Sequence, residues 1–301
     1  MIGEQNGTVW ADGRLREWSS LAVPLMSDAV LRSVAVFDGM RADRAGGRIR
    51  LLAGRAHVKR LLRSARALRI TVEYSVDEIL AAAAEVARAE LDATGEAVAY
   101  VRPMALGARL THEAGPCSLT IAAFAQPDPL PTAMRIQISP FRRPKPDSLP
   151  AQVKAVANYQ LSRLARLGAR AAGYDDAVLL NADGRVAESA GAAIIVERDG
   201  ELMTPPAWES CLPSITVDIL ERIAVTAGIP FSRQPVPLSA LYSADGVALA
   251  GTLADLVEVT CLDDLELPAG PTIGLLRRHY LEALSGGKFA DLLEFAEFPP
   301  P

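Results

Sequence analysis

Two short stretches, Val153-Lys154-Ala155-Val156-Ala157-Asn158-Tyr159 and Arg185-Val186-Ala187-Glu188-Ser189-Ala190-Gly191, are the most informative part of this sequence. Lys154 lies in a mostly apolar run, and burial of an ammonium group favours the neutral, nucleophilic amine. A neutral amine beside the carbonyl group of a cofactor forms a Schiff base. Glu188 supplies a carboxylate that can keep a ring nitrogen of such a cofactor protonated. On spacing alone the pair also fits two solvated surface groups, so the rest of the chain has to decide.

The composition is typical of a globular protein with a large core. The chain has 301 residues, of which 50% are hydrophobic, enough for one large domain or two smaller ones. The longest apolar runs, such as 191–196, are shorter than the ~18 residues of a membrane-spanning helix. The first residues lack the basic and apolar regions of a signal peptide. The net charge of −5 argues against general nucleic-acid binding. We therefore expect a cytoplasmic protein with neither a membrane nor a nucleic acid as partner.

Cysteines and histidines are few and widely spaced, at Cys117, Cys211, Cys261, His57, His112 and His279. An odd number of cysteines without a C-x-x-C pair is typical of reduced cytosolic thiols. A metal centre would have few ligands to draw on, so we expect no metal.

Hydrophobic periodicity predicts an α+β fold without the regular strand–helix alternation of a doubly wound sheet. Helices are predicted over 53–68, 75–91, 158–172, 215–227 and 272–284. Strands are predicted over 8–10, 14–16, 34–37, 48–51, 97–102, 118–124, 177–180, 192–196, 202–203, 247–250 and 256–260. Asp12-Gly13 and Gly46-Gly47 mark tight turns. The alternating prolines of 126–131 indicate an interdomain linker, 140–150 a second proline-rich loop, and 298–301 a loose tail.

Several segments have the properties of a phosphate site. Cys211-Leu212-Pro213-Ser214-Ile215-Thr216 leads into a predicted helix, whose first N–H groups bind anions. Gly251-Thr252 follows a strand and combines close backbone approach with a hydroxyl. Arg60, in the pattern His57-x-x-Arg60-Leu61, adds a guanidinium. Arg63, Arg66 and Arg69 continue the row at helical spacing, and we interpret them as a solvated face. His57 is interpreted as structural.

Taken together, these segments resemble the branched-chain aminotransferase group of class IV aminotransferases, the fold-type IV pyridoxal-phosphate enzymes. Seven collinear motifs carry the resemblance over residues 25–280. They are Val36-Phe37-Asp38-Gly39-Met40-Arg41, His57-x-x-Arg60-Leu61, Tyr100-Val101-Arg102-Pro103, Lys154-x-x-x-Asn158-Tyr159, Glu188-Ser189-Ala190-Gly191, Leu212-Pro213-Ser214-Ile215-Thr216 and Gly251-Thr252.

The resemblance implies a role for each matching residue. Lys154 would form the Schiff base and then act as base and acid in the 1,3-proton shift. Glu188 would pair with the pyridinium nitrogen, and Tyr159 would hydrogen-bond the phenolic oxygen. Arg60, Thr252 and the backbone N–H groups of Ile215 and Thr216 would hold the phosphate. On the substrate side would lie Phe37 as a pocket wall, together with Tyr100 and Arg102, where an arginine can meet the side-chain carboxylate of glutamate.

Some positions depart from the family pattern. Arg32 stands where branched-chain enzymes carry a pocket aromatic residue, so it would either recognise a polar substrate group or point away from the pocket. Leu253 stands where the family has a small residue, which would reshape the floor for the α-carboxylate. Ala192-Ala193 replace a polar pair, and 126–150 lacks the aromatic- and glycine-bearing loop that closes the pocket in typical members.

The expected architecture is a two-domain fold-type IV enzyme, with a small α/β domain over 1–125, a linker over 126–134 and a larger pseudo-barrel domain over 135–301 that carries the lysine. The expected activity is transfer of an amino group between an amino acid, L- and branched-chain-like or polar, and a 2-oxo acid such as 2-oxoglutarate. An aminodeoxychorismate-lyase-like enzyme, a D-amino acid or (R)-amine transaminase, and a non-catalytic cofactor-binding protein remain alternatives. The resemblance also implies a homodimer.

Overall fold

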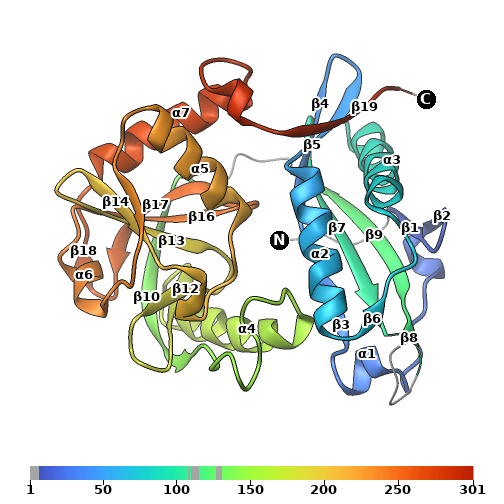
Figure 1. The fold of residues 1–301 in the computed structure, drawn as a ribbon, viewed down its shortest axis with the longest axis horizontal. Coiled ribbons are helices and arrows are strands. Elements are labelled where there is room, and N and C mark those ends of the chain that lie inside the picture. The colour runs from blue at the N-terminus through green and yellow to red at the C-terminus, as the bar shows by residue number, and fades with distance from the viewer. Residues whose placement is uncertain (1–6, 108, 110–114, 127–130, 301) are drawn as a thin grey trace. The chain divides into compact units, whose positions relative to one another are not determined.

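The computed structural model describes residues 7–107, 109, 115–126 and 131–300, and the chain forms two compact units (Figure 1). The first unit comprises Met1–Pro129, Val153–Ala157 and Glu294–Pro301, and the second comprises Leu130–Gln152 and Asn158–Leu293. The lysine segment and the C-terminal segment therefore group with the N-terminal part of the chain by contact. The expected boundaries at 125 and 134 stay a prediction, and 127–130, in the expected linker, lie outside the described residues.

Within the described residues, the first unit has an eight-stranded sheet with the order β19-β5-β4-β7-β9-β1-β2, in which β3 also pairs with β7. The strands are β1 (Thr8–Ala11), β2 (Arg14–Glu17), β3 (Ala35–Phe37), β4 (Met40–Ala45), β5 (Arg48–Leu52), β7 (Val98–Leu106), β9 (Ser118–Ala125) and β19 (Phe295–Phe298). A separate pair is formed by β6 (Ile70–Thr71) and β8 (Gly115–Pro116). The ladders of the large sheet in this unit are antiparallel.

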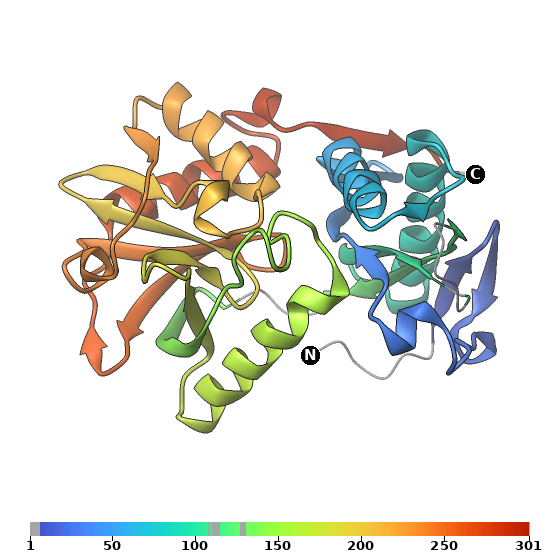
Figure 2. The same ribbon diagram turned by 60° about the horizontal axis from the view of Figure 1, so that its bottom comes forward.

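Two long helices cover one face of this sheet (Figure 2), and they are α2 (Gly54–Ala67) and α3 (Val76–Thr94). Their apolar residues recur at helical spacing, so each helix buries one stripe against the sheet. Ser75 caps α3 by accepting from the Glu78 N–H, while the Glu78 carboxylate accepts from the Ser75 N–H. The shorter elements are η1 (Trp18–Ser20) and α1 (Asp28–Leu31).

In the part of the second unit that the structure describes, a nine-stranded sheet has the order β12-β11-β10-β17-β16-β13-β14-β15, and β18 pairs with β17. Its strands are β10 (Ala133–Arg142), β11 (Asp176–Leu180), β12 (Val186–Ser189), β13 (Ala193–Arg198), β14 (Glu201–Thr204), β15 (Phe231–Arg233), β16 (Gly246–Gly251), β17 (Asp255–Leu262) and β18 (Leu265–Glu266). β10 is parallel to both of its neighbours, β11 and β17, and α4 (Val156–Ala171) lies between β10 and β11 in sequence.

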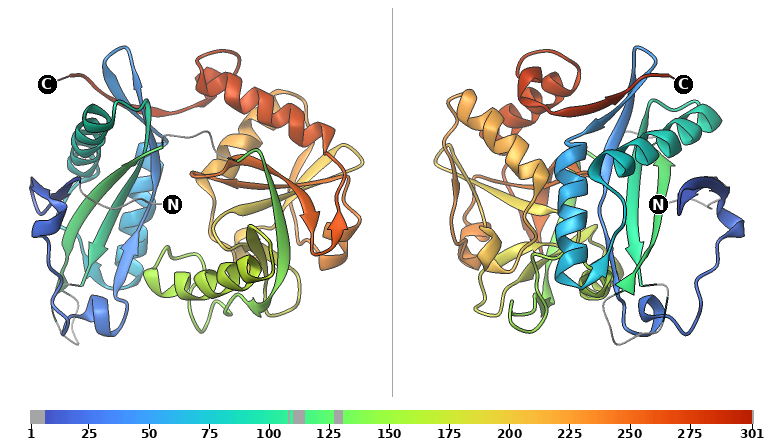
Figure 3. Two further views of the ribbon diagram at one scale, coloured as in Figure 1. Left: turned by 180° about the vertical axis from the view of Figure 1, so that it is seen from behind. Right: turned by 45° about the vertical axis from the view of Figure 1, so that its right-hand side comes forward.

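Helices pack on both faces of this sheet. α5 (Ile215–Thr226) and α7 (Pro271–Leu284) pack against each other and on β16 (Figure 3). On the opposite face, α6 (Leu238–Tyr242) buries Ala240 and Leu241 among alternate residues of the strands, such as Ile194 and Leu249. The 3-10 turns are η2 (Ala207–Glu209) and η3 (Ala290–Leu292). The expected α+β fold is thus confirmed.

Most predicted elements are present within a few residues of the expected ends. The Asp12-Gly13 turn has positive φ at both residues and joins β1 to β2 as a hairpin. The five predicted helices correspond to α2, α3, α4, α5 and α7. The predicted cap of α5 is also correct, because Ser214 Oγ accepts from the Val217 N–H.

Two expectations for irregular backbone are wrong. The expected loop over 140–150 begins with strand, because β10 runs through Pro140 to Arg142. Proline has no N–H for the ladder, and the β10–β11 register shifts between Ile138 and Arg142, which accommodates Pro140. The expected loose tail is also partly ordered: Phe298 ends β19, which pairs with β5, and Arg88 donates to the carbonyls of Phe298 and Pro299.

Candidate active site

The backbone of Lys154 is held on both sides by residues of the first unit. Its N–H donates to Ser64 Oγ at 3.1 Å, and its carbonyl accepts from the Phe37 N–H at 3.1 Å. A β-bridge between Val36 and Ala155 continues this pairing. Lys154 therefore emerges from a fixed main chain, immediately before α4 begins at Val156.

The side chains of Lys154 and Arg102 face the ring of Phe37. Lys154 Nζ lies 5.0 Å from the ring centroid, and the guanidinium carbon of Arg102 lies 5.1 Å from it. Arg102 also donates to Tyr100 Oη at 3.4 Å. Among the described residues, Arg102 Nε is buried without a hydrogen-bond partner. Positive charge and an unsatisfied donor together suit an anionic ligand.

Gly39 makes the position of the Tyr100 ring possible. A Cβ atom at Gly39 would lie 2.0 Å from Tyr100 Oη and 2.4 Å from the ring, so any larger residue would displace the tyrosine. Tyr100 is buried and adjoins Arg41 across the β4–β7 ladder. Glycine at position 39 therefore allows the main chain to pack closely against the Tyr100 ring.

Arg60 forms a buried ion pair with Asp38. Its Nε donates to Asp38 Oδ2 at 2.7 Å and its Nη2 donates to Oδ1 at 2.7 Å, while His57 Nδ1 lies 2.8 Å from Oδ1. Burial alone would raise the pKa of Asp38, but the charge and hydrogen bonds of Arg60 and the hydrogen bond of His57 outweigh it and hold that pKa well below its usual range. A guanidinium has five N–H donors, and these contacts to Asp38 use two of them.

His57 is a buried partner of this ion pair. Burial lowers the pKa of His57, Asp38 opposes the shift through a hydrogen bond and its charge, and the charges of Arg60 and Lys154 reinforce it. The ring is therefore neutral at pH 7, and its Nδ1–H donates to Asp38. This agrees with the structural interpretation of His57.

Arg32 forms an ion pair with Asp28, four residues earlier on α1, and its side chain is 43% exposed. The negative charge of Asp28 therefore offsets the positive charge of Arg32.

In the second unit, Glu188 has a partner at each carboxylate oxygen. Oε1 lies 3.1 Å from Arg143 Nε, and Oε2 accepts from the Leu212 N–H at 3.1 Å. The side chain of Glu188 is 13% exposed and that of Arg143 is 3% exposed. Burial and then the Glu188 carboxylate raise the pKa of the neighbouring Cys211 to about 12, so this thiol stays protonated.

The start of α5 has the geometry of an anion site. The first N–H groups of a helix lack carbonyl partners within that helix, and Ser214 Oγ accepts the N–H of Val217. Ile215 and Thr216, the first two helical residues, are buried. Thr252 and Leu253 lie in the turn after β16, and Leu253 is 41% exposed. Tyr159 is half-buried in α4.

The structure brings the predicted residues together in two groups, one in each unit. The first unit holds Arg32, Phe37, Arg60, Tyr100, Arg102 and Lys154, and the second holds Tyr159, Glu188, Ile215, Thr216, Thr252 and Leu253. Within the part of the chain described, no group of three or more His, Cys, Asp or Glu side chains is arranged to hold a metal ion, and no helix is long and apolar enough to cross a membrane.

Two polar residues of these groups received no role from the sequence. Asp38 lies inside a motif, but its partner Arg60 is 22 residues away. Arg143 lies in the proline-rich segment and meets Glu188 only through the fold. The sequence predicts a proline-rich loop over 140–150, and nothing in this pattern indicates that Arg143 is buried.

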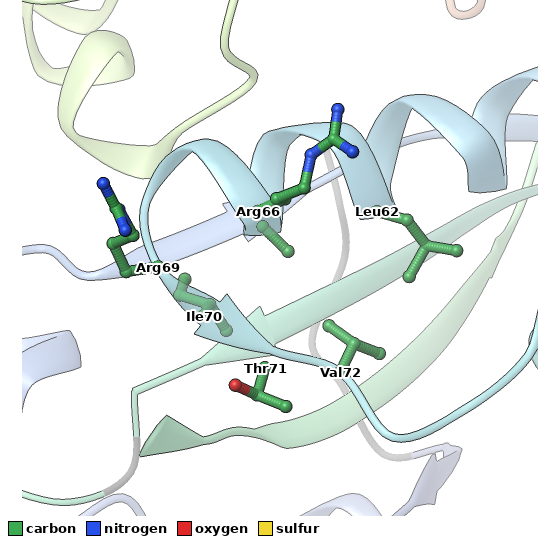
Figure 4. Close-up of a pocket in the computed structure, with 7 residues that line it drawn as sticks. Leu62, Arg66, Arg69, Ile70, Thr71 and Val72 are labelled. Carbon is green, nitrogen blue, oxygen red and sulfur yellow. The ribbon is translucent and has the colours of Figure 1, made fainter. Parts of the chain in front are cut away.

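A pocket of about 420 Å³ lies elsewhere in the first unit, at the end of α2 and at β6. Figure 4 shows the guanidinium groups of Arg66 and Arg69 pointing away from Leu62 and Val72. Both arginines are exposed, as expected for a solvated face, and none of the predicted site residues lines this pocket.

The comparisons with known proteins agree with these features. The family model described as amino-transferase class IV matches residues 35–262. The branched-chain-amino-acid aminotransferase of Escherichia coli (strain K12) is 31% identical over 273 residues, 87% of each chain. The crystal structure of the branched-chain aminotransferase from Thermoproteus uzoniensis with norvaline has a TM-score of 0.89 and 31% identity, covering 96% of this chain and 99% of that one. A second branched-chain amino acid aminotransferase, that of T.th., complexed with N-(5'-phosphopyridoxyl)-L-glutamate, has a TM-score of 0.87 and 27% identity, covering 96% and 98%.

Fold, site groups and relatives together define a pyridoxal-phosphate-dependent transaminase of fold-type IV. The chain belongs to the class IV aminotransferase family. The residues present fit the cofactor: a lysine on a fixed main chain, a carboxylate held in a fixed orientation and a helix N-terminus are the groups that an aldehyde, a pyridine nitrogen and a phosphate require.

Proposed function

We propose that this enzyme transfers the amino group between a branched-chain L-amino acid and 2-oxoglutarate, with glutamate as the second amino acid. The observation that carries the proposal is the cluster of Phe37, Tyr100, Arg102 and Lys154, in which an arginine with a buried unsatisfied Nε lies at the same aromatic ring as the reactive amine. Arg102 suits the side-chain carboxylate of glutamate, while the ring of Phe37 suits an aliphatic side chain.

The names of the relatives support this substrate class. Two of them are branched-chain aminotransferases with norvaline or a phosphopyridoxyl-glutamate bound. Arg32, which departs from the family pattern, forms an ion pair with Asp28, so the positive charge at this position is offset. Leu253, by its size, would narrow the floor that receives the α-carboxylate.

For the cofactor we propose the following roles. Lys154 would hold pyridoxal phosphate covalently through Nζ, and the same amine, once released, would serve as the base and acid at the substrate Cα. Glu188 accepts the ring N–H, and Tyr159 donates to the phenolic oxygen. The phosphate is held by Arg60, Thr252 and the N–H groups of Ile215 and Thr216. When bound, pyridoxal phosphate supplies an electron sink for the pair left at the substrate Cα.

Asp38 and His57 extend this proposal to the phosphate. Asp38 engages Nε and Nη2 of Arg60, which fixes the plane of the guanidinium. The Asp38–Arg60 ion pair has no net charge, so Arg60 would bind the phosphate mainly through oriented N–H donors. The positive end of the α5 helix dipole would then favour the negative charge of the phosphate.

A lyase acting on an aminodeoxychorismate-like substrate and a D-amino acid or (R)-amine transaminase are the alternatives within the fold. A transaminase converts the bound cofactor to its amine form in the absence of an oxo acid, whereas a lyase releases product without leaving the amino group behind.

We also propose that the enzyme is a cytoplasmic homodimer. Segment 23–31 of the first unit exposes five large apolar side chains, namely Val23, Leu25, Met26, Val30 and Leu31. An exposed apolar surface of this kind suits an interface between copies of the chain.

The visible absorption spectrum of the purified protein tests the substrate class. L-glutamate, L-leucine and D-alanine are added separately to the pyridoxal-phosphate form. We expect L-glutamate and L-leucine to bleach the yellow band and D-alanine to leave it unchanged. Bleaching by D-alanine alone would favour the D-amino acid alternative, and a band indifferent to all three would favour a lyase.

A further inference from the structure

Arg143 is one of the most buried cations in the second unit. It follows β10, is 4% exposed, and its Nε donates to the Ser210 carbonyl at 3.0 Å while its Nη2 donates to the Ala151 carbonyl at 3.3 Å. Ser210 has φ of +66°, in the left-handed region that few residues other than glycine adopt. Two separate loops thus present main-chain acceptors to one guanidinium.

Glu188 supplies the charge that compensates Arg143. Burial of a guanidinium is costly without a paired anion, and Glu188 Oε1 lies 3.1 Å from Arg143 Nε. The other oxygen accepts from the Leu212 N–H, two residues before the Ser214 cap of α5. The carboxylate is therefore fixed in orientation by a side chain on one side and by main chain on the other.

We propose that Arg143 is a positioning residue that keeps the proton shared by Glu188 and its ligand on the ligand's heterocyclic nitrogen. The inference rests on the proposed role of Glu188 toward pyridoxal phosphate. A pyridine and a carboxylic acid in a dry site have two arrangements, an ion pair and a neutral pair. Low polarity favours the neutral pair, in which the proton lies on the carboxylate.

A fixed cation reverses this preference. Arg143 stabilises the carboxylate form of Glu188, so the proton resides on the ring nitrogen and the ring withdraws electrons more strongly. Lysine at 143 would keep the charge but not the planar fork that meets two carbonyls and a carboxylate. Arg143 thus holds two loops through hydrogen bonds to their carbonyls and also supplies the positive charge that stabilises the Glu188 carboxylate.

The test is nitrogen NMR of the holoenzyme reconstituted with pyridoxal phosphate that carries ¹⁵N in the ring. The wild type, Arg143→Gln, Arg143→Lys and the matched control Arg166→Gln are compared at one pH. Arg166 forms an ion pair with Asp176 in the same unit, at 3.0 and 3.1 Å, so its loss removes a guanidinium–carboxylate pair that does not include Glu188.

We expect the wild type and Arg166→Gln to give the chemical shift of a protonated ring nitrogen. Arg143→Gln should give a shift at or toward the unprotonated value, and Arg143→Lys should restore most of the protonated signal. Arg143→Gln should also lower kcat about tenfold or more, with a KM change of less than about threefold.

A protonated signal in Arg143→Gln would overturn the inference and leave the role of Glu188 standing. An unprotonated signal in the wild type would overturn the proposed role of Glu188 itself, and the inference with it. If Arg143→Gln does not fold, a pH titration of the ring nitrogen in Arg143→Lys decides. The inference requires this nitrogen to lose its proton at a lower pH than in the wild type, and an unchanged titration contradicts it.

Discussion

At Lys154 the main chain is bonded at both its N–H and its carbonyl, while Nζ extends toward the face of Phe37. A reactive group attached to fixed backbone loses little entropy when it meets its target. Burial lowers the pKa of the nearby His57, and the charges of Arg60 and Lys154 add to that shift.

Lys154→Ala should therefore lose the yellow band and the turnover together, with kcat reduced by about 10³-fold or more because both bond formation and proton transfer depend on one amine. Absorbance and steady-state kinetics measure both. Lys59→Ala, at an exposed position on α2, is the control and should behave as wild type. Turnover retained in Lys154→Ala would contradict the assignment.

Asp38 gives a prediction for stability. Asp38→Asn removes the carboxylate charge that both Nε and Nη2 of the buried Arg60 engage, which should destabilise the protein by about 3–5 kcal/mol in urea unfolding. Reconstitution should also require more pyridoxal phosphate, because the plane of Arg60 is no longer fixed. A variant as stable as wild type would show that Arg60 has another partner of equal strength.

The pH dependence of stability follows from the two lowered pKa values. His57 has a pKa below its value in the unfolded chain, so its contribution is complete above about pH 6.5 and declines as the pH falls below that. The Asp38 contribution is complete above about pH 4 and is lost as the pH falls further. Urea unfolding at pH 8, 6 and 4 should show stability falling in that order, and His57→Gln should flatten the part between pH 8 and 6. A wild-type stability that rises from pH 8 to 6 would contradict this.

At the scale of elements, Gly39 joins β3 to β4 against the Tyr100 ring. Gly39→Ala should displace Tyr100, destabilise the protein by about 1–3 kcal/mol and raise the KM for glutamate, because Arg102 donates to Tyr100. The control is Gly168→Ala in α4, where a Cβ meets nothing within 4 Å, and which should stabilise by about 0.5–1 kcal/mol. Thermal unfolding measures the change in stability, and steady-state kinetics measure the KM for glutamate. A Gly39→Ala enzyme with wild-type stability and KM would show that the Tyr100 ring can move without cost.

The sequence predicted the long helices, but it did not predict strands β10 and β19. Amphipathic spacing located the long helices, because their stripes face one sheet each. β10 was missed because its Pro140 reads as a strand breaker, although a register shift accommodates it. β19 was missed because four residues near a terminus give little periodicity, while their pairing partner β5 lies more than 240 residues away.

The residues of the candidate site also differ in whether the sequence predicts their roles. Collinear motifs identified Lys154, Glu188 and the phosphate residues, since each motif is local in sequence. The partners that orient these groups are distant in sequence. Asp38 and Arg60 are 22 residues apart, and Arg143, which follows β10, contacts Glu188 on β12, with β11 between these two strands. Such pairs are fixed by tertiary contact, so their roles become visible only in the folded chain.

At the scale of the whole molecule, each unit has its own sheet and core, and the proposed residues are divided between them. The proposed homodimer predicts that Leu25→Glu combined with Met26→Glu shifts the mass measured by light scattering from dimer to monomer at micromolar concentration, because two exposed apolar side chains become charged. Leu167→Glu, at an exposed apolar position on α4, is the control and should remain dimeric. A monomeric wild type would contradict the proposal.

Transfer of the amino group itself is the most direct test of the account. The holoenzyme is supplied with L-glutamate labelled with ¹⁵N at the amino group and with 4-methyl-2-oxopentanoate, and the leucine formed is examined by mass spectrometry. We predict ¹⁵N-labelled L-leucine with wild type and none with Lys154→Ala. Absence of label from leucine, with the cofactor bound and Lys154 intact, would contradict the assignment of a branched-chain transaminase.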